Sequence, residues 1–371
     1  MTRLDDLYND VGQSPWIDNI RRDWLDDGTL AGYVAEGVRG VTSNPSIFAK
    51  ALATSSAYDE RIAGLASDDP ETVFEHLAVA DVRDACDVLA GVHEASRADF
   101  AAGRRRYLDG FVSLEVSPRL AHDTQATIAA ARRLAGAVGR ANVMIKIPAT
   151  RAGLEAISTV LGDGINVNVT LIFSIERYLE VMDAWASGIE RAIEHGHDVS
   201  SVSSVASFFV SRLDVAVDQL LAPEDPRRGS VAVAQVARAY ASYQDVVGAA
   251  RVQGLLARGA QVQRPLWAST STKNPAYDEL LYVDSIAADE TVTTMPDATL
   301  AAALARGSYG DSILRDGERI GAALATLDAL GSSVDLAEVT QRLEDEGVAA
   351  FIASYDELLA TVRTKLVPGS S

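Results

Sequence analysis

Eight short segments of apolar or alternating residues recur along most of this sequence, each bounded by turn-forming residues. They lie at residues 15–18, 40–44, 111–116, 143–147, 166–172, 200–206, 264–268 and 291–295. Between them the apolar residues follow a helical spacing, as at 126–137 and 177–194. Strands that alternate with helices form parallel sheets, and eight such units close into a barrel. The sequence therefore predicts an α/β fold, a (β/α)₈ TIM barrel.

The spacing of these segments is uneven, which predicts additional helices. Residues 48–110 and 208–263 are long enough to hold them, and the region after Met295 keeps a helical period through Val348, Phe351 and Tyr355. No Pro- or Ser-rich linker, repeat or low-complexity tract divides the 371 residues. We therefore expect one elaborated barrel domain over residues 1–366, followed by a flexible tail at 367–371.

The charge balance is strongly acidic. Lys and Arg number 33 and Asp and Glu number 52, which gives a net charge of −19. Such a surface repels nucleic acid and anionic membranes, so neither is an expected partner. An anionic small substrate is not excluded, because salt screens the overall field within about 8–10 Å and a few local cations decide binding.

Several features are expected of a cytoplasmic protein and disfavour a nucleotide cofactor. Its single cysteine, Cys86, lies on an apolar helical pattern and is expected to be a buried thiol. No signal peptide, no apolar run of about 18 residues and no nucleotide-binding glycine motif is present. His195 and His197 flank a glycine at a predicted helix end, so we expect no metal site there.

Polar residues share one face of several predicted strands. Lys146 alternates with Val143, Ile145 and Ile147, while Asn168 and Thr170 alternate with apolar neighbours. The same holds for Glu115, and Asp18 ends the first segment. Outward faces of a barrel strand meet a helix layer and should be apolar, so the polar set should point inward. Polar side chains that point inward near the carboxyl ends of the strands are typical of the catalytic end of a barrel.

Lys146 offers the most reactive chemistry of this set. Burial lowers the pKa of a lysine from its usual value of about 10.4 and raises the neutral, nucleophilic fraction. A neutral amine forms a Schiff base with a carbonyl, and the iminium then permits cleavage of the adjacent carbon–carbon bond. A lysine that reaches solvent at the strand end, or a structural ion pair with Glu115, is the alternative. The inward carboxylates of Asp18 and Glu115 favour catalysis, since they can divide the proton transfers that such a cycle needs.

Three neutral side chains accompany these groups. Asn44, Asn168 and Thr170 can hydrogen-bond the hydroxyls of a sugar or a water molecule. Turn and strand-end polarity is the alternative explanation, and Asn44 before Pro45 is a plausible turn initiator by itself.

Four motifs in order resemble the transaldolase family. GVTSNPSIFAKA (40–51) resembles its second-strand signature, VSLEVSPRLAHDT (112–124) the motif around its catalytic glutamate, VMIKIPAT (143–150) its Schiff-base lysine motif and GINVNVTLIFS (164–174) its fifth-strand motif. The resemblance continues through SVASFFVSRLD (204–214), LWASTSTKNP (266–275) and the TMP segment at 294–296. It therefore covers most of the chain.

The resemblance implies a role for each candidate residue. Lys146 would form the Schiff base, Asp18 would take the proton of the C4 hydroxyl, and Glu115 with Thr170 would hold the water that shuttles protons. Asn44, Asn168 and Ser207 would bind the dihydroxyacetone unit, and Arg212 the phosphate. Lys273 stands where the family commonly has a second phosphate-binding arginine. A lysine provides a point charge in place of a bidentate fork.

The implied reaction is transfer of a dihydroxyacetone unit between sugar phosphates, in which sedoheptulose 7-phosphate and glyceraldehyde 3-phosphate give erythrose 4-phosphate and fructose 6-phosphate. It needs no metal or organic cofactor, because the lysine iminium accepts the electrons. The expected partners are small-molecule sugar phosphates, and a homodimer is a possible assembly.

Two alternatives remain open at this point. A related class I fructose 6-phosphate aldolase would release free dihydroxyacetone, and that branch commonly has a tyrosine where this chain has Phe209. Phe209 cannot donate a proton, which favours transfer over release. The second alternative is a sugar-phosphate-binding barrel without catalysis, which the joint presence of Lys146, Asp18 and Glu115 disfavours.

Overall fold

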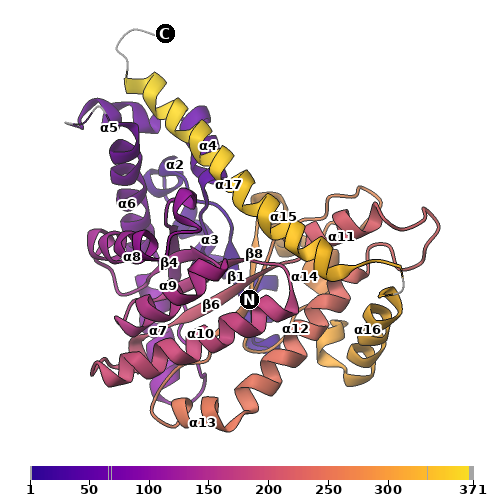
Figure 1. Ribbon diagram of the computed structural model, residues 1–371. Coiled ribbons are helices and arrows are strands. Elements are labelled where there is room, and N and C mark those ends of the chain that lie inside the picture. The colour runs from indigo at the N-terminus through magenta and orange to yellow at the C-terminus, as the bar shows by residue number, and fades with distance from the viewer. Residues whose placement is uncertain (1, 66, 68, 332, 367–371) are drawn as a thin grey trace.

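The eight expected strands form a closed barrel. The computed structural model describes residues 2–65, 67, 69–331 and 333–366. In these residues each strand pairs in parallel with its neighbours in sequence, and the first pairs with the last (Figure 1). The strands are β1 (Ser14–Ile17), β2 (Gly40–Val41), β3 (Phe111–Glu115), β4 (Val143–Pro148), β5 (Val167–Ile172), β6 (Ser204–Phe209), β7 (Arg264–Ala268) and β8 (Val292–Met295). The predicted fold class is confirmed.

Helices follow every strand and surround the barrel. One helix follows each of β3, β4, β5 and β7: α8 (Thr124–Val138), α9 (Arg151–Gly162), α10 (Ile175–Glu194) and α14 (Leu281–Ser285). The other connections hold α2 (Arg22–Asp26), α3 (Thr29–Ala35), α4 (Pro45–Thr54), α5 (Asp59–Ala63), α6 (Pro70–Val88), α7 (Ala90–Ala101), α11 (Ser211–Asp218), α12 (Val231–Gly248) and α13 (Ala250–Leu256). The short α1 (Arg3–Asp6) precedes β1, and α15 (Asp297–Arg306), α16 (Gly317–Leu330) and α17 (Leu336–Leu366) follow β8. The additional helices expected in the two long segments are thus present.

Side-chain caps explain where several of these helices begin. Asp123, Thr150 and Ser174 each accept a hydrogen bond from the backbone N–H three residues later. Asn44 does the same for α4, and Pro45 follows it at the first helical position. Such caps satisfy N–H groups that the first helical turn leaves unpaired. Three of these helices, α4, α9 and α10, start within four residues of the preceding strand, so the loops there at the barrel's carboxyl end are short.

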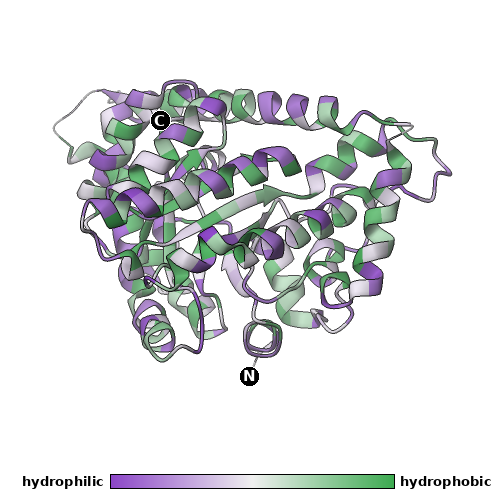
Figure 2. Ribbon diagram, turned by 60° about the horizontal axis from the view of Figure 1, so that its bottom comes forward, coloured by the Kyte–Doolittle hydropathy of each residue, from purple (hydrophilic) through white to green (hydrophobic). Residues whose placement is uncertain are grey.

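The alternation of side chains along the strands is as expected. Asn168 on β5 donates a hydrogen bond to Ser113 Oγ on β3, at 3.0 Å, and its carbonyl oxygen accepts one from Ser207 on β6. Because β3 and β5 are separated by β4, these side chains meet inside the barrel. Figure 2 shows the complementary outer layer, where helices carry both hydrophobic and hydrophilic residues around hydrophobic strands.

Two strands differ from the prediction by more than one residue at an end. The second strand, expected at 40–44, has only two residues, because Thr42 and Asn44 turn their side chains to Asp18 and to the start of α4. The sixth, expected at 200–206, begins at Ser204. Asp198 accepts hydrogen bonds from the N–H and hydroxyl of Ser200, which forms a 3₁₀ turn at Val199–Ser201. Local side-chain hydrogen bonds thus replaced the strand that the serine-rich pattern predicted.

A buried ionic cluster closes the amino end of the barrel. Asp109 accepts hydrogen bonds from Ser14 Oγ (2.5 Å), Trp16 Nε1 (3.0 Å) and Arg39 Nε (3.0 Å), and Arg264 Nη2 lies 3.4 Å away. Burial favours the neutral acid, but the charges of Arg264 and Arg39 outweigh it and hold the pKa of Asp109 below its usual range. This end of the barrel is therefore a packed plug that leaves the opposite end for a site.

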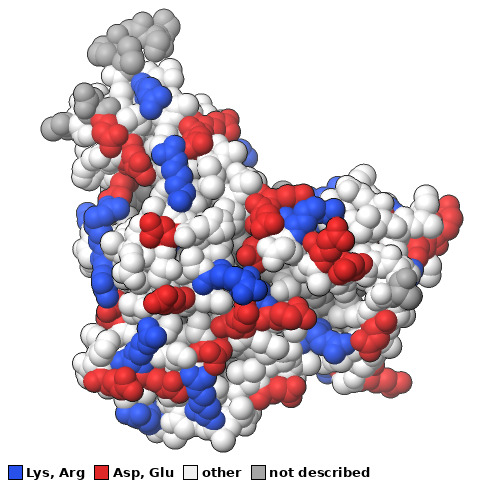
Figure 3. Space-filling view, in the orientation of Figure 1, with Lys and Arg blue, Asp and Glu red and all other residues white. Residues whose placement is uncertain are grey.

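The surface carries charges of both signs. On the face seen in Figure 3, Lys and Arg side chains are interspersed with Asp and Glu and do not gather in one basic patch. Among the described residues, the helices are all too short or too polar to cross a membrane. The tail expected at residues 367–371 lies outside the described residues, and the single-domain boundary at 366 stays a prediction.

Candidate active site

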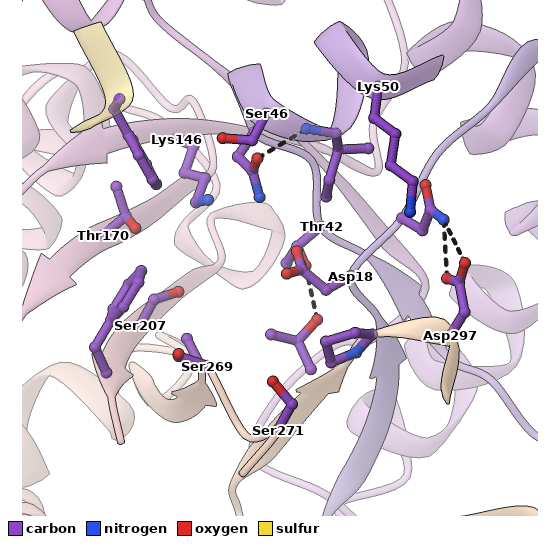
Figure 4. A pocket seen from close by; sticks show the side chains of 18 of the residues that line it. Asp18, Thr42, Ser46, Lys50, Lys146, Thr170, Ser207, Ser269, Ser271 and Asp297 are labelled. Atoms are coloured by element: carbon purple, nitrogen blue, oxygen red, sulfur yellow. Dashed lines mark hydrogen bonds between the residues drawn. The ribbon is translucent and has the colours of Figure 1, made fainter. Parts of the chain in front are cut away.

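A pocket of about 640 Å³ opens at the carboxyl ends of the strands. Figure 4 shows Lys146, Thr170 and Ser207 pointing into it from β4, β5 and β6, with Asp18 opposite them at the end of β1. The wall also includes Thr42 and the start of α4. The structure thus brings together side chains that lie far apart in the sequence, from Asp18 to Phe351.

Lys146 lies at the centre of this arrangement. Its side chain is 5% exposed, and its Nζ donates a hydrogen bond to the backbone oxygen of Ser43 at 3.2 Å. Glu115 Oε2 lies 3.5 Å from the same nitrogen, and the ring of Phe351 has its centre 5.7 Å away. The buried amine is therefore held by one carbonyl and one carboxylate, with an aromatic ring nearby, a setting that suits an attack on a carbonyl carbon.

Glu115 is a carboxyl group placed to exchange protons. Burial raises its pKa to about 7, and the charge of Lys146 only partly opposes this. Both carboxylate oxygens are buried without a hydrogen-bond partner among the described residues, and so is Thr170 Oγ1. Buried polar atoms of this kind are usually satisfied by water or a ligand. Their position beside Lys146 marks the place where a small polar group can bind.

Asp18 occupies the opposite wall. Its Oδ1 accepts a hydrogen bond of 2.6 Å from Thr42 Oγ1, and Thr42 is in turn 2.7 Å from Thr294 Oγ1. Burial raises the pKa of Asp18, while Lys146 and the Thr42 hydrogen bond oppose the shift. The pair formed by Thr42, just after β2, and Thr294, in β8, therefore fixes one carboxylate oxygen of Asp18 and leaves the other to face the pocket.

Two cations line one side of the pocket. Arg212, in the first turn of α11, lies over the ring of Phe209 at 5.3 Å from its centre. Lys273 Nζ donates to Ser271 Oγ at 2.6 Å. Burial lowers the pKa of both groups, and the charge of Arg212 lowers that of Lys273 further. Like charges that share a wall are favourable only next to an anion, so this pair is suited to a phosphate.

The remaining candidates lie in or beside the pocket. Ser207 and Phe209 line it, and Phe209 packs against Phe173 at 5.1 Å between ring centres. Asn44 also lines it, although its Oδ1 is engaged with the N–H of Ile47. Asn168 is fully buried beneath Ser207 and is not part of the lining. Its link to a ligand therefore runs through the Ser207 hydroxyl.

Several lining residues were not identified from the sequence. Thr42 directly follows the short strand β2 and Thr294 lies in β8, and no spacing in the sequence distinguishes them from other threonines. Asn19 and Asp297 join the loops after β1 and β8 through hydrogen bonds of 2.8 and 2.9 Å. Phe351 belongs to an apolar helical pattern that indicates burial but does not say which strand end it covers.

Cys86 and His195 do not line this pocket. Cys86 is buried in α6, and burial raises the pKa of its thiol. His195 caps the end of α10, where its Nδ1 lies 2.9 Å from the backbone oxygen of Gly162. Among the described residues, no group of three or more His, Cys, Asp or Glu side chains is arranged to hold a metal ion.

Comparison with known proteins agrees with this site. Residues 15–362 match the family described as Transaldolase/Fructose-6-phosphate aldolase. The chain belongs to this family. It is 48% identical over 366 residues to Transaldolase 1 of Streptomyces coelicolor, which covers 96% of this chain and 93% of that protein. It is 44% identical to the transaldolase of Saccharopolyspora erythraea, over 97% of both chains, and 47% identical to that of Mycobacterium leprae, over 96% of this chain and 95% of the relative.

Membership of the transaldolase and fructose 6-phosphate aldolase family covers all eight strands, because the match begins within β1 and ends within α17. It therefore includes the lysine, both carboxylates and both phosphate-binding candidates. It does not by its name distinguish transfer from release, since both activities stand in the family's description.

Proposed function

We propose that this protein is a transaldolase that transfers a dihydroxyacetone unit between ketose and aldose phosphates in the non-oxidative pentose phosphate pathway. The donor is sedoheptulose 7-phosphate, the acceptor is glyceraldehyde 3-phosphate, and the products are erythrose 4-phosphate and fructose 6-phosphate. The observation that carries the proposal is the pocket in which the Lys146 amine faces the carboxyl group of Asp18, while the buried carboxyl group of Glu115 lies 3.5 Å from the same amine. The similarity to proteins named transaldolase over nearly the whole chain supports it.

The cycle begins with imine formation. The neutral Lys146 amine attacks the C2 carbonyl of the ketose, and the resulting carbinolamine loses water to form the iminium. Glu115, with a pKa of about 7, can both accept and donate these protons near neutral pH. A water molecule held between Glu115 and Thr170 would relay them, which accounts for the unpartnered oxygens on both side chains.

Carbon–carbon cleavage follows on the opposite wall. Asp18 takes the proton of the C4 hydroxyl, the C3–C4 bond breaks, and its electron pair moves through C3 and C2 to the iminium nitrogen. The aldose phosphate leaves, and the three-carbon unit stays on Lys146 as an enamine. An acceptor aldehyde then forms a new bond to C3, and the proton on Asp18 returns to the new hydroxyl.

Substrate binding is divided between the two ends of the pocket. Asn44 and Ser207 would hold the dihydroxyacetone hydroxyls, with Asn168 orienting Ser207 through their 2.7 Å hydrogen bond. Arg212 and Lys273 would bind the phosphate. The net charge of −19 does not oppose this, because two local cations act on the phosphate at short range.

Release of free dihydroxyacetone, as in an aldolase, is the second candidate. It would be favoured by a proton donor near the bound enamine. The side chain next to Arg212 on this wall is Phe209, which has no donor. We therefore favour transfer. A barrel that only binds sugar phosphates is the third candidate. The trapping experiment below tests it, since such a protein would form no adduct at Lys146.

The setting of the protein is also part of the proposal. We infer a cytoplasmic enzyme built as one domain over residues 1–366, with sugar phosphates as its partners and neither nucleic acid nor membrane among them. A homodimer is a possible assembly. The acidic charge balance and the single cysteine support this inference.

Borohydride trapping tests the proposed function. Incubation with fructose 6-phosphate and sodium borohydride should leave a reduced three-carbon adduct on Lys146, located by peptide mass mapping. Lys146→Ala should abolish the adduct. Asp18→Asn should still form an iminium but slow carbon–carbon cleavage by roughly 100-fold or more, the usual range for loss of a general base. Absence of any adduct in folded wild-type protein would refute the Schiff-base mechanism.

A further inference from the structure

Helix α17 forms a roof over the candidate active site. In Figure 1 this helix runs diagonally across the molecule, and its contacts extend from α11 to α5. One of its side chains enters the pocket: Phe351 is 5% exposed, and its ring lies 5.7 Å from Lys146 Nζ. The ring therefore occupies one face of the position where the iminium forms.

The roof is attached on several sides of the barrel. Polar contacts hold it to helices and turns that belong to different strands, so its position is set by the whole rim of the barrel. These contacts are Glu344 with Arg177 at 3.3 Å, Ser354 with Ser46 at 2.8 Å and Asp356 with Arg119 at 2.6 Å. Phe351 is thus held over Lys146 by a fixed helix.

Gly347 lets α17 approach β5 closely, and this contact sets the distance between the helix and the barrel. A Cβ atom at Gly347 would lie 3.2 Å from Leu171 Cδ2 and 3.4 Å from Phe173 Cε2, so a larger residue there would crowd both. Leu171 has a φ of +60°, which a leucine rarely adopts, and the pairing of β5 with β6 is irregular between Val169 and Ile172. Strained backbone of this kind beside an active site indicates a geometry that the surrounding packing maintains. Thr170 lies within this irregular stretch.

We propose that Phe351 determines the fate of the bound three-carbon unit by excluding water from one face of the enamine, so that transfer prevails over release. This inference rests on the proposed function. The enamine has two competing fates. In transfer, C3 forms a bond to the aldehyde carbon of the acceptor. In release, C3 takes a proton, water adds to C2 of the iminium, and the C2–N bond breaks to give dihydroxyacetone and the free Lys146 amine.

Release needs water twice: as the proton source at C3 and as the nucleophile at C2. Transfer needs it only at the final hydrolysis of the product iminium, which Glu115 and Thr170 are placed to assist. An aromatic ring over Lys146 offers neither a proton nor room for water. Its apolar bulk therefore disfavours the first step of release without obstructing the water between Glu115 and Thr170.

The test is the ratio between dihydroxyacetone release without an acceptor and transfer with erythrose 4-phosphate, both from fructose 6-phosphate. Phe351→Ala opens the space above Lys146 and should raise this ratio about tenfold or more, equivalent to a change of at least about 1.4 kcal/mol in the difference between the two barriers. Phe351→Leu keeps much of the apolar bulk and should give a smaller increase. Leu359→Ala is the control, since Leu359 is buried on the same helix and does not line the pocket. It should leave the ratio within about twofold of the wild type.

The outcomes separate this inference from the proposed function. If wild-type protein forms no adduct at Lys146, the proposed function fails. If wild type transfers but the Phe351 variants keep its ratio, Phe351 does not protect the enamine and the inference fails. If Leu359→Ala raises the ratio as much, loosening of α17 is the cause and the inference also fails. Should Phe351→Ala not fold, the rate at which Phe351→Leu forms dihydroxyacetone carrying deuterium at C3 in D₂O gives the same decision: relative to transfer, it must exceed that of the wild type.

Discussion

The pair formed by Lys146 and Glu115 shows how burial prepares both partners for reaction. The two groups lie 3.5 Å apart, yet Glu115 keeps a raised pKa because the cost of burying its charge exceeds the attraction of the amine. A carboxyl group that titrates near neutrality can pass protons in both directions within one cycle. The same burial that makes it useful makes its charged form unfavourable for the fold.

The cost of burying the charged Glu115 carboxylate predicts a pH-dependent gain in stability when Glu115 is replaced by a neutral residue. The folded pKa is about 7 against an ordinary value of 4.5, so folding favours the protonated form. Its contribution is complete below pH 4.5 and is lost as the pH rises through 7. The free energy of unfolding of Glu115→Gln should therefore exceed that of the wild type by about 3 kcal/mol at pH 8. At pH 5 the difference should be less than about 1 kcal/mol.

Urea unfolding at the two pH values measures this difference. Glu155→Gln, at an exposed position on α9, is the control and should show no comparable change between them. Equal stability of Glu115→Gln and wild type at pH 8 would mean that the carboxylate is better solvated or paired than its contacts indicate.

Residue patterns predicted the inward polar side chains well, because alternation along a strand is a local property. Lys146, Glu115 and Thr170 each lie where period-two spacing placed them. Phe351 and the hydrogen bond between Asn19 and Asp297 depend on which elements meet after the barrel closes. Nothing within a few residues of Phe351 specifies that contact.

At the scale of elements, glycines govern how closely some helices approach. A Cβ atom at Gly188 on α10 would lie 2.7 Å from Leu161 Cβ and 2.9 Å from the backbone oxygen of Ser158 on α9. The absence of a side chain lets these two helices pack at short distance. Gly136 on α8 is exposed and has no neighbouring atom within 4 Å of such a Cβ.

The same substitution should therefore have opposite effects on the two helices. Gly188→Ala forces a shift of α10 away from α9 and should lower the free energy of unfolding by about 1–3 kcal/mol. Gly136→Ala should raise it by about 0.5–1 kcal/mol, because alanine loses less backbone entropy in a helix. Thermal and urea unfolding of both variants test the pair. A stabilised Gly188→Ala would mean that α9 and α10 tolerate a wider spacing.

Element boundaries were harder to predict than element order. The order of eight strands and their helices followed from the recurring pattern and is confirmed. The sixth strand was placed four residues too early, because the hydroxyl groups near Ser200 were read as part of a strand when Asp198 binds them in a turn. Hydrogen bonds of this kind compete with strand pairing and leave little trace in hydrophobic periodicity.

At the scale of the whole molecule, the two ends of the barrel have opposite tasks. The carboxyl end is open and holds reactive groups, whereas the amino end is closed by Asp109 and its four partners. Because Asp109 connects residues from β1, β7 and the segment before β2, it ties together strands that are distant in sequence. Removing one partner of a buried ion cluster leaves uncompensated charge in the core.

Asp109→Ala should consequently lower the free energy of unfolding by about 3–5 kcal/mol, since it strands two buried guanidinium groups. Asp99→Ala removes a carboxylate that pairs with Arg104 at 2.6 Å on the surface, and it should change stability by less than about 1 kcal/mol. Urea unfolding at neutral pH compares the two. Similar losses for both would show that the Asp109 cluster is no more important than a surface ion pair.

The order of the chain adds a consequence for synthesis. Lys146 and both carboxylates leave the ribosome long before the helix that covers them, because α17 follows all eight strands. A growing chain can therefore close its barrel while the reactive amine still faces open water. On this view the enzyme favours transfer over release only after α17 has folded over the pocket. Damage confined to that helix would give protein that still forms the Schiff base but releases dihydroxyacetone in place of transferring it.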